Sequence, residues 1–63
     1  MSSFGEMSKD CIENFMFVQE AMLAAREENA EKTYAVLKKK YIILKATLNS
    51  IGVNITELDM IKE

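Results

Sequence analysis

The chain has 63 residues, of which 49% are hydrophobic, with two glycines, one cysteine and no proline, histidine or tryptophan. A chain of this length forms one domain at most, so we expect a single domain over residues 1–63. Without histidine and with one cysteine, the usual histidine- or cysteine-based catalytic centres and zinc sites cannot form within one chain. A disulfide-rich secreted scaffold is excluded for the same reason.

The net charge of −2 is spread unevenly along the chain. Residues 6–29 carry a net charge of −4, residues 30–52 carry +4, and residues 53–63 carry −2. No apolar stretch approaches the roughly 18 residues of a membrane span, and the first ten residues lack a basic region followed by an apolar run. We therefore expect a soluble, cytoplasmic protein with acidic and basic segments that attract each other.

The first element predicted is an amphipathic helix over residues 8–28. Its apolar seam recurs at intervals of four and three residues: Cys11, Phe15, Val18, Met22 and Ala25. A second stripe widens this apolar face: Ile12, Met16 and Leu23. Ser8 is the preferred N-cap and Ser3 the alternative, since a serine oxygen accepts from the free amides of the first turn. Residues 1–7 are then expected to be flexible.

A second helix is predicted over residues 30–51 from an apolar seam at the spacing of a coiled coil or helix bundle: Ala30, Tyr34, Leu37, Tyr41, Leu44, Leu48 and Ile51. Gly52 follows directly and provides a left-handed stop. The two seams are out of phase, so a single straight helix could not bury both against one partner. The break falls at residues 26–31, where Asn29 either ends the first helix in a left-handed conformation or caps the second.

The last element predicted is one or two helical turns over residues 57–61. Thr56 is the expected N-cap, and Leu58 and Ile61 would face the hairpin. The fold class is therefore all-α: an antiparallel helical hairpin with a short C-terminal helical turn. We expect it to assemble into a four-helix bundle or to pack on a partner.

No catalytic, cofactor or metal site is predicted, so the chain is expected not to be an enzyme and to have no small-molecule substrate. Cys11 falls in the apolar seam, which favours a small buried side chain over a reactive thiol. Glu13, Glu20 and Glu27 recur every seven residues, which is typical of a solvated stripe rather than of a carboxylate held in a pocket.

Lysines of the second helix are the residues that could contact a polyanion by neutralising phosphates: Lys38, Lys39, Lys40 and Lys45. Three consecutive residues spread over about 200° of a helix surface, so they do not form one patch. The acidic first helix and the acidic tail would also repel nucleic acid. Because of these lysines, a dimeric regulator associated with nucleic acid is kept as the alternative function, although the lysine spacing and the acidic segments count against it.

The apolar content exceeds what two seams can bury, and this surplus predicts a partner interface. The residues expected to form it are Phe17, Met16, Leu23, Val36, Ile42 and Ile43. The partner would be a second copy of the chain, a helical protein, or both. The leading function is a non-enzymatic interaction module, such as a small adaptor, a chaperone-like protein or a regulator.

Overall fold

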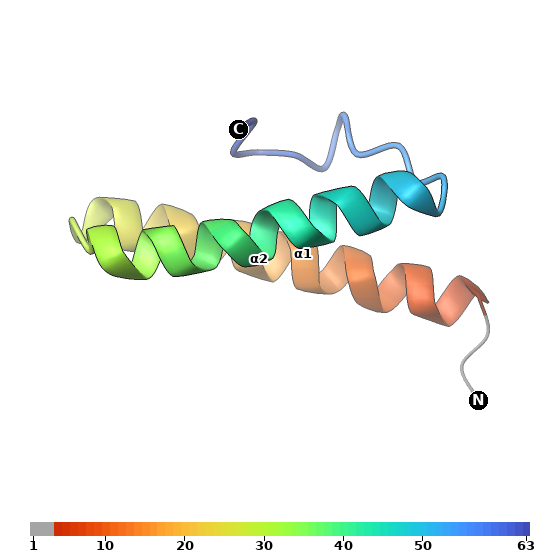
Figure 1. Ribbon diagram of the computed structural model, residues 1–63, viewed down its shortest axis with the longest axis horizontal. Helices are drawn as coiled ribbons and strands as arrows, with labels where there is room; N and C mark the ends of the chain where they lie inside the picture. The colour runs from red at the N-terminus through yellow and green to blue at the C-terminus, as the bar shows by residue number, and fades with distance from the viewer. Residues whose placement is uncertain (1–3) are drawn as a thin grey trace.

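Two antiparallel helices and a returning tail make up the part of the chain that the computed structural model describes, residues 4–63. Helix α1 spans Phe4–Glu27 and helix α2 spans Glu31–Ser50, with no strand over that range. The helices pack against each other, and the tail runs back along them from the end of α2 (Figure 1). The predicted helical hairpin is confirmed. Neither described helix is long and apolar enough to cross a membrane.

Helix α1 begins earlier than the sequence pattern indicated. It starts at Phe4, so Ser8 lies inside the helix and the prediction that Ser8 is the N-cap was wrong. The alternative cap, Ser3, lies outside the described residues. Residues 4–7 form the first turn, because only Gly5 in this stretch has a strongly unfavourable helix propensity.

The connection between the helices is a tight Schellman turn, with Asn29 in the left-handed conformation at φ 57°. The amide of Asn29 donates to the Arg26 carbonyl at 3.1 Å, and that of Ala30 donates to the Ala25 carbonyl at 2.8 Å. These two bonds are the pair that defines the motif. Asn29 therefore ends α1, and Ala30 occupies the N-cap position of α2 without a side-chain cap.

The end of α2 repeats the same motif, with glycine in place of asparagine. Gly52 has φ 85°, its amide donates to the Asn49 carbonyl at 3.1 Å, and that of Val53 donates to the Leu48 carbonyl at 2.9 Å. The left-handed stop predicted at Gly52 is confirmed. It turns the chain so that the tail heads back toward the hairpin (Figure 1).

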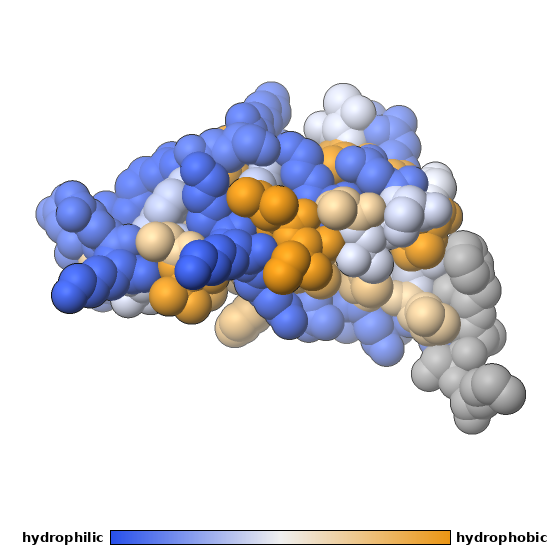
Figure 2. All heavy atoms as spheres, in the orientation of Figure 1, coloured by the Kyte–Doolittle hydropathy of each residue, from blue (hydrophilic) through white to orange (hydrophobic). Residues whose placement is uncertain are grey.

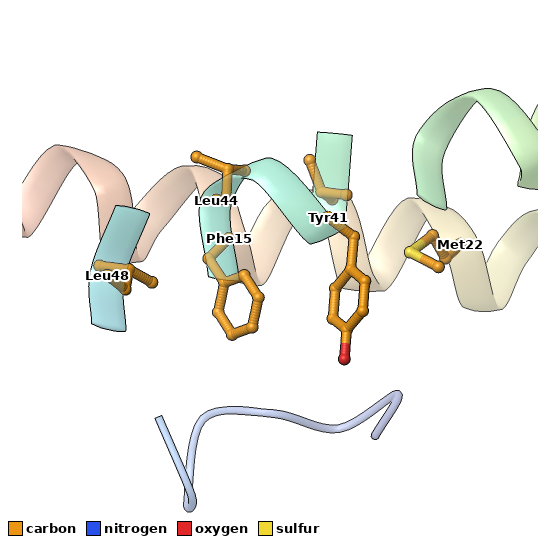
Figure 3. Packing of buried hydrophobic residues seen from close by; sticks show 6 residues of the cluster. Phe15, Met22, Tyr41, Leu44 and Leu48 are labelled. Atoms are coloured by element: carbon orange, nitrogen blue, oxygen red, sulfur yellow. The ribbon is translucent and has the colours of Figure 1, made fainter. Parts of the chain in front are cut away.

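The core lies between the helices and is built from both predicted seams. Its buried cluster contains Phe15, Val18, Met22, Tyr41, Leu44 and Leu48. Figure 3 shows the ring of Phe15 beside that of Tyr41, both directed toward the tail. Partly buried side chains of the hairpin surround this cluster: Cys11, Ile12, Met16, Tyr34, Leu37 and Ile51.

The tail forms a single turn rather than the short helix expected at residues 57–61. The Ile55 carbonyl accepts from the amides of Leu58 and Asp59 at 3.0 and 2.8 Å. Thr56 is not an N-cap: its amide instead donates to the Asn54 side chain at 2.9 Å, an Asx turn that competes with helix formation. The prediction that Leu58 and Ile61 face the hairpin is confirmed, since both pack on the core cluster.

Candidate interaction surface

Three large apolar side chains lie exposed on the outside of α2. Val36 is 65% exposed, Ile43 is 61% exposed and Ile42 is 50% exposed. Val36 and Ile43 are seven residues apart, which is two helical turns, so they lie on one side of the helix. In Figure 2 hydrophobic side chains gather over α2 within a largely hydrophilic surface. We call Val36 and Ile43 the α2 stripe.

Helix α1 also exposes apolar side chains. Phe17 is 70% exposed, and Leu23 is 37% exposed. Met16, the remaining residue predicted for the interface, is partly buried and packs on the core cluster. The structure therefore leaves five of the six predicted residues at the surface and places Met16 at the edge of the core.

Charged residues of opposite sign flank these two apolar surfaces. Exposed Glu13 and Glu20 lie four residues before and three residues after Phe17, on the same side of α1. Exposed Lys39 and Lys40 lie between Val36 and Ile43 along α2, each within one turn of both. The apolar surface of α1 thus has an acidic border, and that of α2 has a basic border.

The four lysines considered for polyanion binding are divided between two surroundings. Lys38 pairs with Glu63 at 3.5 Å, and Lys45 pairs with Asp59 at 2.9 Å, so both face carboxylates of the tail. Lys39 and Lys40 are exposed. Two of the four lysine charges are therefore paired with carboxylates of the chain itself.

A polar cluster between α2 and the tail was missed by the sequence reasoning. The buried Tyr41 hydroxyl donates to Asp59 Oδ1 at 2.6 Å, and Lys45 pairs with Asp59 Oδ2. Burial opposes ionisation of Asp59, but the hydrogen bonds from Tyr41 and Lys45 outweigh it and lower the pKa of the carboxyl. The hydrogen bond to Asp59 raises the pKa of Lys45. Asp59 is therefore held as a carboxylate beside an ammonium group.

Gln19 is a second residue that the sequence reasoning missed. Its side chain is fully buried and bonds to the main chain of the tail. The sequence did indicate that Gln19 lies beside the apolar seam, because it follows Phe15 by four residues and precedes Met22 by three. A polar residue at such a position predicts a buried hydrogen-bond partner, but the partner itself cannot be read from the spacing.

Cys11 and the glutamates that recur along α1 are the other groups that the sequence analysis considered for chemistry. Cys11 is half-buried against the core cluster. Glu13, Glu20 and Glu27 are exposed. Among the described residues, no group of three or more acidic or cysteine side chains is placed to hold a metal ion.

No protein family, curated protein or solved structure matches this chain.

Proposed function

We propose that this protein is a non-enzymatic, cytoplasmic protein–protein interaction module that binds through the exposed apolar surfaces of its two helices. The observation that carries this proposal is the α2 stripe, whose two β-branched side chains are more than 60% exposed on the same side of one helix. Isolated exposed hydrophobic residues are ordinary. A stripe repeated over two turns beside a lysine pair is typical of a helix-packing surface.

The fold does not need this stripe for its own core. Both seams are covered by the opposite helix, and four apolar residues of the tail add a further layer: Val53, Ile55, Leu58 and Ile61. The tail thus supplies part of the apolar contact that the sequence assigned to a second chain. The large apolar side chains that stay exposed are Met7, Phe17, Leu23, Val36, Ile42, Ile43 and Met60. Contact of the α2 stripe and of Phe17 with another protein would remove the most exposed of them from water.

The partner that the charges favour is a second copy of the chain. In a twofold dimer, α1 of each protomer would pack on α2 of the other, so the surface is self-complementary. Each contact would bring Phe17 with its acidic border against the α2 stripe with its basic border. The product would be a four-helix bundle with the tails on the outside.

Sedimentation equilibrium of the full chain between 1 and about 100 μM tests this proposal. We expect a dimer for the natural chain and an association at least tenfold weaker for Ile43→Ala and for Phe17→Ala. Circular dichroism should show unchanged helicity in both variants, because substitutions of exposed side chains alter stability little. Asn49→Ala, an exposed change elsewhere on α2, is the matched control and should dimerise normally.

Two results would count against the proposal. A natural chain that stays a fully helical monomer over this range would show that its surface does not self-associate. Loss of helicity in Ile43→Ala or Phe17→Ala would show that these side chains belong to the core.

Raising the salt concentration should weaken the dimer, because part of the attraction is between charged borders.

A further inference from the structure

The tail is a third layer that packs on residues of both helices, and we call the surface that it covers, which includes Gln19 of α1 and Tyr41 and Lys45 of α2, the groove. Its apolar side chains pack on the core cluster at four positions: Val53, Ile55, Leu58 and Ile61. Within the tail itself, the hydrogen bonds are those of one turn at Ile55, one Asx turn at Asn54 and one bond from the Lys62 amide to the Asp59 side chain. The helices, rather than its own secondary structure, therefore hold the tail in place (Figure 1).

Gln19 of α1 binds the main chain of the tail. Its Oε1 accepts hydrogen bonds from the amides of Met60 and Ile61, the second at 3.0 Å. Its Nε2 donates to the Leu58 carbonyl at 2.9 Å. All three bonds go to backbone groups, so they depend on the turned backbone conformation of residues 58–61 and not on the side chains there.

The side chain of Asp59 binds polar groups of α2. Tyr41 and Lys45 of α2 bind its two carboxylate oxygens at 2.6 and 2.9 Å. The Lys62 amide donates to the same carboxylate at 2.8 Å. Hydrogen bonds to a charged acceptor are about twice as strong as neutral ones, so these contacts favour a carboxylate over a neutral side chain at the position of Asp59.

We propose that this groove is a binding site for an acidic segment of another protein that adopts the same turned conformation as the tail, and that the tail occupies it as an internal competitor. The segment would carry a carboxylate, with branched apolar side chains one residue before it and two residues after it, as Leu58 and Ile61 flank Asp59. Main-chain recognition by Gln19 would set the register, and Tyr41 with Lys45 would bind the carboxylate.

This site is separate from the surface proposed for dimerisation. Ile43 is two residues from both Tyr41 and Lys45, which is about 200° around the helix in either direction. The α2 stripe and the groove therefore lie on different sides of α2. A chain could expose either surface while the other is occupied, so the groove proposal does not depend on the dimer.

The tail is joined directly to α2, which gives it an effective concentration on the order of millimolar at the groove. An external segment at micromolar concentration competes poorly unless the tail is weakened. The state of the tail thus controls access to the groove. Binding in trans should become measurable when apolar contacts of the tail are removed and Gln19, Tyr41 and Lys45 are left unchanged.

The test uses the full chain with Leu58→Ala and Ile61→Ala combined, and a fluorescein-labelled peptide of residues 53–63 as the probe. Fluorescence anisotropy should give a Kd at least tenfold lower for this variant than for the natural chain. An Asp59→Asn peptide should bind the variant at least tenfold more weakly. Glu57→Ala, a change at an exposed tail position, should behave as the natural chain does.

If the double variant loses helicity, circular dichroism provides a second measurement. Recovery of the helical signal on adding the natural peptide, and not the Asp59→Asn peptide, would support the site. Equal binding of the peptide to the variant and to the natural chain would overturn the proposal, because the peptide would then occupy another surface. Absence of both binding and recovery would overturn it too, since the groove would then hold the tail only as part of the core.

Discussion

The ring of Phe15 on α1 stacks on the ring of Tyr41 on α2, with centroids 5.5 Å apart and 13° between the ring planes. Both rings are fully buried, and the Tyr41 hydroxyl extends beyond the stack to reach Asp59 of the tail (Figure 3). One pair of residues therefore joins all three layers. Tyr41 contributes an apolar face to the hairpin and a polar group to the tail.

Tyr41→Phe separates these two contributions. The substitution keeps the stacked ring and removes the hydroxyl that binds Asp59, so we expect the free energy of unfolding to fall by about 1–2 kcal/mol. Urea denaturation followed by circular dichroism measures the change. Tyr34→Phe is the matched control, because its hydroxyl bonds to Glu63 at the exposed surface, and its effect should stay within about 0.5 kcal/mol. Equal losses in both variants would contradict the role of Tyr41.

Gln19→Leu tests whether the tail depends on its main-chain contacts with α1. Leucine keeps an apolar volume in the site but leaves the part-buried amides of Met60 and Ile61 without their acceptor, and the loss of such bonds costs about 1–3 kcal/mol at most. We expect a stability loss of that size and faster hydrogen exchange at these two amides, with smaller changes in α1 and α2. Glu20→Ala, at the exposed neighbouring position, should leave exchange in the tail unchanged.

The helical pairing was predictable because it depends on local spacing. Apolar residues that recur at intervals of three and four, such as Phe15, Val18 and Met22, lie on one face of a helix. The stop at Gly52 was predicted because glycine enters the left-handed conformation readily. At Asn29 the sequence left two roles open, and the structure shows that Asn29 ends α1 in the left-handed conformation. The start of α1 was predicted at the wrong residue because serine occurs inside helices as well as at N-caps, and no other residue near Ser8 marks where the helix begins.

The tail could not be placed from the sequence for a different reason. Its groove contacts join residues far apart in the chain, as Gln19 joins Met60 and Ile61 across 41 and 42 positions. No period links such residues, and a segment of eleven residues is too short to display one. Thr56 matched the sequence pattern of an N-cap. In the structure its amide donates a hydrogen bond to the Asn54 side chain, and this Asx turn takes the place of a helix start. Asp59 was consequently interpreted as a helix residue instead of a partner for Lys45.

Acid should weaken the attachment of the tail through Asp59. Its pKa in the folded chain is lowered, so the stability it provides is present above its unfolded pKa of about 3.9 and is lost as the pH falls through the folded value. Asp59→Asn should therefore be less stable than the natural chain at pH 7, and the difference should shrink below pH 4. Urea denaturation at pH 7, 4, 3 and 2 measures it. Glu57→Gln, an exposed carboxyl of the same segment, should show no such convergence, and a constant difference for Asp59→Asn would contradict the mechanism.

Gly52→Ala tests the turn that directs the tail toward the hairpin. A Cβ at this position would meet no atom within 4 Å, so crowding is absent and the cost arises from φ 85° alone. A left-handed residue with a Cβ costs about 1–2 kcal/mol, and we expect a loss in that range by urea denaturation. Gly52→Asn should lose less, because asparagine tolerates this conformation, as Asn29 does at the other turn. Equal losses for alanine and asparagine would show that the side chain, and not the backbone conformation, sets the cost at this position.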